Sequence, residues 1–298
     1  MGDLQIEKGS GAKPRVTFYV DGTATDLDGA CTATLTKPDG TAGPASGTVS
    51  HVSPTGSGTY EFTLSQQNEL TWYDIAWTGA IGGVATAVTT RVEVVGEFLF
   101  TLAALRAVKV AGALPFQSAT DYPNQTLLDR RTQVTDDFEA RTGYSFIPRF
   151  ARETFDGDGQ SSLILSKYLC QRLLTVIVDG TAQTISDYTL ADTGLLQRKT
   201  GGAFPATTPQ NVVVEYAYGW ARPPAEISEV ALARAAMLLL PSQAGSTVST
   251  WTTPDGVTYS YDQAGQSFGG GRRYFGIPKI DSVLSDPAYN ARRGGVFA

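Results

Sequence analysis

The chain has 298 residues, of which 42% are hydrophobic and 17% are charged, and its net charge at pH 7 is −6. This length is enough for two domains and a sizeable hydrophobic core. Residues 1–98 carry five basic and eleven acidic side chains, whereas residues 99–298 carry 18 of each. An acidic first part and a neutral remainder argue against nucleic-acid binding by the whole surface.

The two cysteines, Cys31 and Cys170, lie far apart in sequence, each in an apolar stretch. This placement predicts two buried thiols and neither a disulfide framework nor a zinc site. The first residues, MGDLQIEKGSG, lack the apolar segment of a signal peptide. The longest apolar run is too short and too interrupted to span a bilayer. We therefore expect a protein of a cytosol-like compartment with no membrane partner.

Residues 12–97 show the alternation of β-strands. Several short strands separated by turn residues predict a β-sandwich of the immunoglobulin type over residues 1–98. The expected strands include Val16–Val20, Cys31–Thr36, the alternating Tyr60, Phe62 and Leu64, the alternating Tyr73, Ile75 and Trp77, and Val84–Val95. Trp77 is the expected core tryptophan and Trp72 is its rival. The paired cysteines of antibody domains are absent, so only the architecture is implied.

After Gly96 the hydrophobic period becomes helical. Thr101 can cap a short helix that we expect to run through Lys109. The longest predicted helix covers Pro123–Thr142 and ends at Gly143 in the left-handed cap position. Its buried stripe is expected to consist of Leu127, Leu128, Val134 and Phe138, with Arg130, Asp136, Asp137 and Glu139 facing outward.

Residues 150–218 return to strands, with a hairpin signal at Asp179-Gly180. The stretch 211–241 then reads as a strand, a break at Gly219 and a helix that ends at Pro241. The buried face of this helix is expected to carry Ile227, Val230, Ala231 and Leu238. A β-rich segment is thus inserted between two helices that we expect to pack on each other.

The last part of the chain is predicted to contain a hairpin over 246–261, turned at Asp255-Gly256, a glycine-rich stretch over 263–271, and a short helix over 277–284. Ile280, Val283 and Leu284 lie on one side of that helix. Residues 272–298 hold five basic and two acidic side chains. Arginine and aromatic residues are enriched at interface anchors, so this tail is a candidate docking surface for an acidic partner. A tail that makes no contact is the alternative. The docking residues are Arg272, Arg273, Tyr274, Phe275, Ile277, Ile280, Arg292, Arg293 and Phe297.

No stretch predicts a catalytic, metal or cofactor site. His51 is the single histidine and has no nucleophile motif, so we expect a solvent-facing or half-buried strand residue. Asp156-Gly157-Asp158-Gly159 resembles the start of a calcium loop, but the fifth and twelfth positions are Gln160 and Lys167. A β-turn is the better interpretation. Gly269–Gly271 lacks the strand and helix of a phosphate loop and is expected to be a linker. The acidic pairs Asp136/Asp137 and Glu226/Glu229 are expected to be solvated helix charges.

From Thr101 onward the order of elements resembles a known family. The phrases that carry the resemblance are TLAALRAVK, LLDRRTQVTDDFEARTGYSFIPR, DGDGQSSLILSKYLCQRLLTVIVDGTAQTISDYTLADTGLLQR, VVVEYAYGWARPPAEISEVALARAAMLLL, GVTYSYDQ and FGIPKIDSVLS. Over about two thirds of the chain they are similar to the head–tail connectors, or adaptors, of long-tailed bacteriophages of the siphophage type.

The resemblance implies a non-enzymatic virion protein of the neck, assembled in the bacterial host cytoplasm. Members of the family form a ring, commonly twelve-fold, beneath the portal protein and above a neck stopper or tail terminator. Genomic DNA passes through the lumen without sequence-specific contacts. The resemblance also implies a helical core wrapped by β hairpins and a C-terminal segment that reaches the portal. The first domain departs from the minimal family.

The predicted fold class is therefore α+β and multidomain. We expect an immunoglobulin-like sandwich over 1–98, a helical adaptor core over 99–244 with a β insertion at about 150–218, and a hairpin with an extended docking tail over 245–298. The main alternative is a surface or tail module whose sandwich binds a glycan or a host-surface protein, with Trp72 or Trp77 as the exposed aromatic. A glycosidase using two carboxylates is a more distant alternative.

Overall fold

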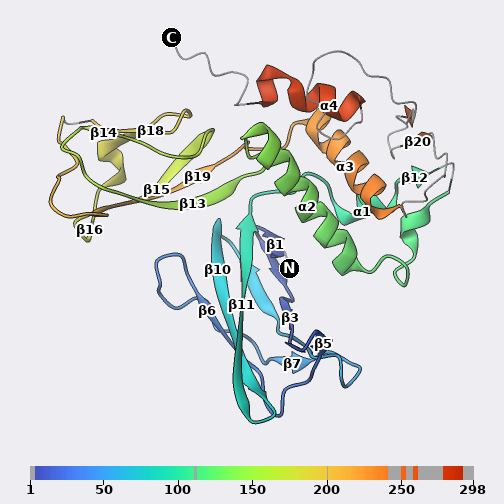
Figure 1. The fold of residues 1–298 in the computed structure, drawn as a ribbon. Coiled ribbons are helices and arrows are strands. Elements are labelled where there is room, and N and C mark those ends of the chain that lie inside the picture. Colours follow the sequence, from blue (N-terminus) through green and yellow to red (C-terminus); the bar gives the residue numbers. More distant parts are fainter. Residues whose placement is uncertain are drawn as a thin grey trace. The chain divides into compact units, whose positions relative to one another are not determined.

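The computed structural model describes residues 4–110, 113–199, 201–240, 250–252, 258–260 and 278–290, and these residues form mostly β-sheets with few helices (Figure 1). The chain divides into two compact units. The first unit comprises Asp3–Glu97 and Pro148–Tyr218, and the second comprises Phe98–Ile147 and Gly219–Ala298. The β-rich segment between the two long helices thus belongs to the same unit as the first domain.

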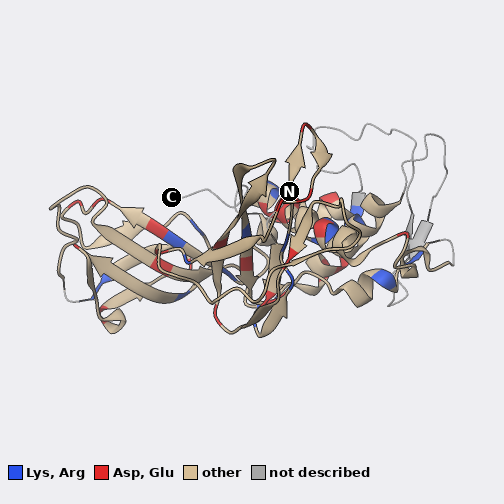
Figure 2. Cartoon of the chain, turned by 90° about the horizontal axis from the view of Figure 1, so that it is seen from below, with Lys and Arg blue, Asp and Glu red and all other residues tan. Residues whose placement is uncertain are grey.

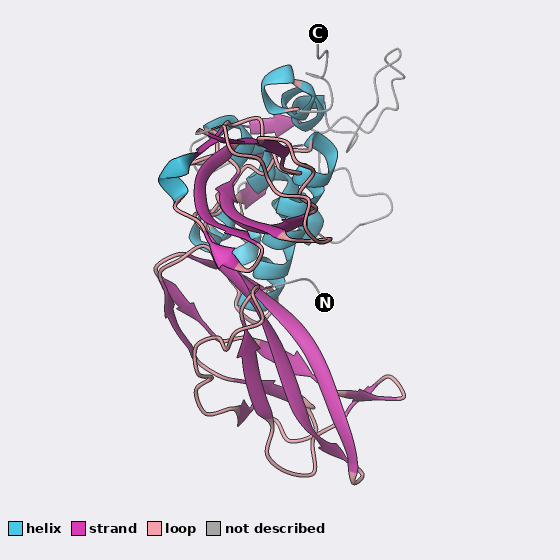
Figure 3. Cartoon of the chain, turned by 90° about the vertical axis from the view of Figure 1, so that its left-hand side faces the viewer, coloured by secondary structure: helices cyan, strands magenta, loops and turns pink. Residues whose placement is uncertain are grey.

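Residues 4–97 form two layers of strands around one core. The main sheet has the order β1-β11-β10-β6, with β1 (Leu4–Glu7) parallel to β11 (Val84–Val95), and with β10 (Thr71–Ile81) antiparallel to both β11 and β6 (Thr32–Thr36). Figure 3 shows β10 and β11 as a long two-stranded ribbon. The remaining pairs are β3 (Arg15–Thr17) with β8 (Thr59–Glu61), β7 (Ser50–His51) with β8, β2 (Ser10–Ala12) with β9 (Leu64–Gln67), and β4 (Tyr19–Val20) with β5 (Thr23–Ala24).

The core of this domain follows the alternation of its strands. Ile75 and Trp77 of β10 are fully buried, and they meet Phe18, Phe62 and Leu64 from the facing strands. The indole Nε1 of Trp77 donates to Thr90 Oγ1 over 2.8 Å, so the buried ring leaves no donor unpaired. The sandwich and the core position of Trp77 are therefore as the sequence predicts.

Residues 148–218 form two further sheets. One has the order β13-β19-β15-β16 and the other has the order β14-β18-β17. Their bounds are β13 Arg149–Phe155, β14 Ser162–Ile164, β15 Cys170–Val178, β16 Thr181–Ala182, β17 Tyr188–Leu190, β18 Leu195–Arg198 and β19 Val212–Tyr218, with a 3₁₀ turn η2 at Ile185–Asp187. Asp179-Gly180 turns the β15–β16 hairpin as predicted, with both residues at positive φ.

These two sheets enclose a core of their own. Val176, Val214, Tyr216, Leu196 and Phe204 are all fully buried in it. The resemblance implied a helical core wrapped by β hairpins, and that arrangement stays a prediction. Because each sheet has one apolar face, the two faces cover each other within the segment.

The helices belong to the second unit. They are α1 (Leu102–Arg106), α2 (Asn124–Thr142), α3 (Ala225–Leu239) and α4 (Pro278–Ser285), with 3₁₀ turns η1 (Pro115–Gln117) and η3 (Pro287–Tyr289). As predicted, α2 and α3 pack on each other, and α4 packs against both. No helix within the described residues is long and apolar enough to cross a membrane.

Most of the residues that begin or end the helices are the ones that the sequence predicts. Thr101 caps α1 by accepting from Ala104 N over 3.1 Å, and Gly143 ends α2 with a φ of 81°. The helix expected through Lys109 instead ends at Arg106. Lys109 and Val110 form strand β12, which pairs with β20 (Thr250–Thr252), and β20 pairs with β21 (Thr258–Ser260). The expected turn at Asp255-Gly256 lies outside the described residues.

The buried stripes need two small corrections. In α2, Leu127, Val134 and Phe138 are fully buried as predicted, but Leu128 is only half-buried. In α3, Ile227, Val230 and Ala231 are fully buried, whereas Leu238 is half-buried and Leu239 takes the buried place. In α3 the buried position moves by one residue, and in α2 Leu128 lies at the edge of the buried stripe, as a helical period of 3.6 permits.

Candidate functional site

The predicted docking tail lies mostly outside the described residues. Ile280 alone of the docking set falls within them, and none of its side chain is exposed. Ile280 and Leu284 point from α4 into the core of the second unit, against α2 and α3. Ile280 is therefore removed from the docking set, because a side chain buried in its own chain has no surface for a portal. Arg272, Arg273, Tyr274, Phe275, Ile277, Arg292, Arg293 and Phe297 lie outside the described residues.

The segment 278–290 is anchored at several points. Lys279 Nζ lies 2.8 Å from Glu229 Oε1 on α3. The Tyr289 ring lies 6.3 Å from the Phe146 ring and 6.0 Å from the Trp220 ring, measured between centroids. The fully buried Asn290 donates from Nδ2 to Leu284 O over 3.1 Å. This segment is thus part of the helical core of the second unit.

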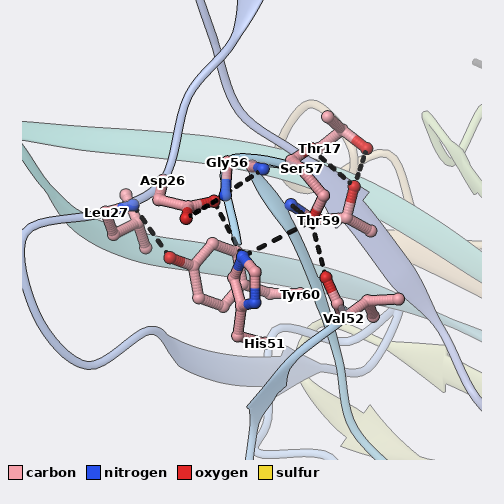
Figure 4. A network of polar contacts seen from close by, with 10 residues as sticks. Thr17, Asp26, Leu27, His51, Val52, Gly56, Ser57, Thr59 and Tyr60 are labelled. Carbon is pink, nitrogen blue, oxygen red and sulfur yellow. Dashed lines mark hydrogen bonds and ion pairs between the residues drawn. The ribbon is translucent and has the colours of Figure 1, made fainter. Parts of the chain in front are cut away.

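A polar cluster in the first domain brings the single histidine to a carboxylate and a serine (Figure 4). His51 Nε2 lies 2.7 Å from Asp26 Oδ1 and 3.4 Å from Ser57 Oγ. The sequence did not predict this cluster, because Asp26 and His51 are 25 residues apart and meet only in the folded domain. His51 is an exposed residue of β7, with 28% of its side chain exposed, which agrees with the expected solvent-facing or half-buried strand position.

The geometry of this cluster differs from that of a catalytic triad. In a triad the carboxylate holds one ring nitrogen and the serine hydroxyl bonds the other. Here Asp26 and Ser57 both lie at the same nitrogen, Nε2. In addition, the Ser57 hydroxyl donates to Val52 O over 2.6 Å, so its proton is directed to the backbone. The arrangement therefore does not prepare Ser57 as a nucleophile.

Asp26 instead fastens the loop that follows β7. Its carboxylate accepts from Gly56 N over 2.6 Å and from Gly58 N over 2.7 Å (Figure 4). The Gly56 N–H lowers the pKa of Asp26, and His51 and the Gly58 N–H add to this effect, whereas burial acts in the opposite direction. Gly58 has a φ of 61°, and a Cβ there would lie 2.6 Å from Thr25 N, so the close approach requires glycine.

The rings of His51 and Tyr60 add to these contacts. The His51 ring stands edge-on to Tyr60 with 5.1 Å between centroids. Tyr60 is buried, and its hydroxyl accepts from Leu27 N over 2.8 Å. We call Asp26, His51, Ser57 and Tyr60 the Asp26 clasp. It joins the segment around Leu27 to the loop after β7, and its function is structural.

The second acidic motif is also engaged with the backbone. Asp156 Oδ1 accepts from Gln210 N over 2.6 Å, and Asp158 Oδ1 accepts from Gln160 N over 2.9 Å. Gly157 N donates to the side chain of Asn211 over 2.7 Å. These bonds define a turn. Among the residues that the structure describes, no group of His, Cys, Asp and Glu is arranged to hold a metal ion.

A polar cluster at the edge of the second β core also escaped sequence reasoning. Glu153 accepts from Tyr216 OH over 2.6 Å and from Ser166 N over 3.0 Å, and it also bonds the Ser166 hydroxyl. Burial, and then Glu153, raise the pKa of Tyr216.

Burial also raises the pKa of the Cys170 thiol to about 12 and that of the Cys31 thiol to about 11. Both thiols are buried and free, as the sequence predicts, and they are unsuited to nucleophilic chemistry.

The surface-binding alternative names Trp72 or Trp77 as its exposed aromatic, so the exposure of these two side chains bears on it. Trp77 is fully buried. Trp72 is half-buried, and the Arg91 guanidinium carbon lies 4.0 Å from its ring centroid, while Arg91 also bonds Asp74 over 2.8 Å. A cation therefore covers one face of the Trp72 ring, and of the two tryptophans only the buried Trp77 is removed as the exposed aromatic of this alternative.

The described charges are mixed in sign. Figure 2 shows blue and red segments interspersed along strands and helices. Many are paired within the chain, such as Arg15 with Glu61 and Arg152 with Glu215. This pattern is typical of a solvated surface rather than of a nucleic-acid site.

Comparisons with known proteins add little to this description. No family model matches the chain, and no curated protein is similar to it. Among solved structures, one that is similar is a chimeric titin Z1Z2-Z1Z2 tandem functionalised with a GRGDS peptide from fibronectin. It shares 9% identity over 74% of this chain and 81% of that chain, with a TM-score of 0.24. A likeness at this TM-score carries no argument. The fold and the clusters define the class, a mostly β protein of two compact units whose polar clusters fasten loops and strands.

Proposed function

We propose that the protein is a structural component of a bacteriophage virion, a head-to-tail adaptor that forms an oligomeric ring beneath the portal. In this role it joins the DNA-filled capsid to the tail and performs no chemical step. It is assembled in the cytoplasm of the bacterial host and resides in the virion neck.

The order of elements supports this proposal most directly. A short capped helix, a long helix, a β segment and a second long helix follow one another as α1, α2, β13–β19 and α3. These are the residues whose phrases resemble the adaptor family. The two long helices pack together although the whole β segment separates them in sequence. This order of elements, with the β segment between the two long helices, is what the resemblance to the adaptor family rests on.

The proposal assigns a role to each part of the chain. The second unit is the protomer core, and the exposed faces of the 148–218 segment contact neighbouring copies; Ile164 there is 77% exposed. The remaining docking residues, which flank α4, bind an acidic surface of the portal. A neck stopper or tail terminator binds the opposite end of the ring. DNA crosses the lumen with backbone contacts at most, and the first domain, of immunoglobulin type, decorates the ring.

Negative-stain imaging of the purified full-length protein, alone and mixed with portal, tests the proposal. We expect rings in the mixture with portal, and we expect them to be attached to it. Single copies under both conditions would contradict it. Deleting residues 272–298 is a poor test of docking, because it also removes Ile280 and Leu284 from the core of the second unit.

A sharper variant keeps α4 and replaces Arg272, Arg273, Arg292 and Arg293 with alanine. We expect rings that no longer bind the portal. The matched control replaces Lys13 and Arg15 with alanine; their side chains are 62% and 42% exposed on the first domain. Equal portal binding by the arginine variant and the control would remove the docking role from these arginines.

A further inference from the structure

The β10–β11 ribbon leaves a long stretch of sheet edge open. β10 pairs with β11 from Val94 back to Val84, whereas β1 covers only Val92–Val95 on the other side of β11 (Figure 1). Within the described residues, no strand pairs with that other side along Val84–Thr90. This stretch is the open edge.

The turn of the ribbon determines which backbone groups face outward. Gly82 and Gly83 have φ values of 58° and 77°, which is the two-residue type I′ hairpin turn. In such a hairpin the closing pair, Ile81 with Val84, exchanges hydrogen bonds, and bonded pairs then alternate along the ribbon. The even-numbered residues of β11 therefore bond β10.

The odd-numbered residues of β11 consequently direct N–H and C=O to the other side. Val95 shows this phase directly, because its carbonyl accepts from Lys8 N over 2.7 Å on the β1 side. Along the open edge the outward groups belong to Ala85, Ala87 and Thr89. All three residues are exposed.

The open edge lacks the features that prevent the sheet edges of different molecules from pairing. Natural edges are usually blunted by lysine, proline, bulges or short length. Residues 84–90 read VATAVTT, without a charge or a proline, and their register with β10 is unbroken. Val84 is 67% exposed. An edge of this kind is a template for an added strand.

We propose that this edge pairs antiparallel with the same edge of a second copy, about a two-fold axis at Ala87. In this register Ala87 lies opposite Ala87 of the other copy, and Ala85 lies opposite Thr89. Each outward N–H and C=O of these three residues then meets a partner in the phase that an antiparallel pair requires.

The same register also keeps the two faces of the sheet separate. The exposed odd-numbered residues lie opposite odd-numbered ones, and the half-buried Thr86 and Val88 lie opposite each other on the core side. A second copy is the favoured occupant because its edge has the same groups in the same phase, so one pairing closes both edges. Such a contact closes on two copies. It differs from the head-to-tail contact of a ring and does not depend on the proposed function.

Charge substitution at the axis tests the pairing and its register. We expect full-length wild-type protein to show a concentration-dependent dimer in sedimentation velocity. Ala87→Lys places two like charges on residues that lie opposite each other, about 5.5 Å apart between Cα atoms, and should abolish the dimer. Ala87→Glu should abolish it in the same way, and an equimolar mixture of the two variants should recover a heterodimer.

Thr34→Lys is the matched control. Thr34 is exposed on the same face of the sheet but lies on β6, opposite Ala76 and away from the open edge. This variant should dimerise like wild type, and circular dichroism should show all variants folded. A wild-type protein that remains monomeric, an Ala87→Lys protein that still dimerises, or a mixture that recovers no heterodimer would each overturn the proposal. Rings seen with portal bear on the proposed function only.

Discussion

At the residue scale, the Asp26 clasp shows how a catalytic set of residue types can have a structural role. Aspartate, histidine and serine meet, but the Asp26 carboxylate accepts hydrogen bonds from Gly56 N and Gly58 N, and the Ser57 hydroxyl donates to Val52 O. Residue types alone would have suggested a hydrolase. The assignment of ring nitrogens and donors decides against it.

Because the Asp26 carboxylate accepts hydrogen bonds in the Asp26 clasp, we expect the stability of the folded protein to depend on pH. Hydrogen bonds from Gly56 N, His51 and Gly58 N hold the folded-state pKa of Asp26 below its ordinary value. Its contribution is therefore present above the unfolded pKa and is lost as the pH falls through the folded pKa. We expect Asp26→Asn to lower the melting temperature at neutral pH, and the wild-type and variant melting curves to converge in acid. Asp21→Asn is the control, since Asp21 lies in the β4–β5 turn with a φ of 49°, a conformation that asparagine tolerates. A difference in melting temperature that stayed constant into acid would rule out the carboxylate as its source.

Asn211 holds together the turn at Gly157 and the loop before β19. Its side chain accepts from Gly157 N over 2.7 Å and donates to Pro205 O over 2.7 Å and to Thr207 Oγ1 over 2.9 Å. Asn211 is 7% exposed, so Asn211→Ala leaves buried backbone groups without partners. We expect urea unfolding to show a loss of about 3 kcal/mol. Asn68→Ala, at an exposed position, should change stability by less than about 0.5 kcal/mol. Equal effects of the two variants would contradict the role given to Asn211.

At the element scale, local signals predicted the ends of helices and strands better than their partners. Thr101 and Gly143 act through bonds within a few residues, so the sequence near them was sufficient. Lys109 was wrongly placed in a helix because its partner, Thr252, lies far along the chain. The 148–218 strands were located, but not the closure of their two sheets on each other. That closure depends on which apolar faces meet, which periodicity within one strand cannot specify.

The packing of α4 is the element-scale feature most open to test. Ile280 and Leu284 are fully buried, whereas the Lys279 side chain of the Lys279–Glu229 pair is 44% exposed. We expect Leu284→Ala to cost about 2–5 kcal/mol and to remove hydrogen-exchange protection from residues 278–290. Lys279→Ala should cost at most about 1 kcal/mol. Exchange in α4 that is unchanged by Leu284→Ala would show that apolar burial does not hold this helix.

At the scale of the whole molecule, the chain combines two kinds of surface. Several described charges are paired within the chain, such as Arg15 with Glu61 and Arg91 with Asp74, while the open edge of β11 has no charge from Val84 to Thr90. The cationic docking residues lie in the sequence flanking α4. A contact made through the open edge should depend on backbone hydrogen bonds, and a contact made through the arginines should depend on charge.

Salt should therefore separate the two proposed contacts. Exposed charges are screened over about 8 Å at physiological ionic strength and over about 3 Å at 1 M, so portal binding through Arg272, Arg273, Arg292 and Arg293 should weaken steadily with added sodium chloride. Dimerisation through the open edge should change little over the same range, because its partners are uncharged N–H and C=O groups. Surface plasmon resonance on immobilised portal and sedimentation of the free protein measure the two responses. Portal binding that is indifferent to salt would contradict docking by the arginines, and a dimer dissolved by salt would contradict pairing through the backbone of β11.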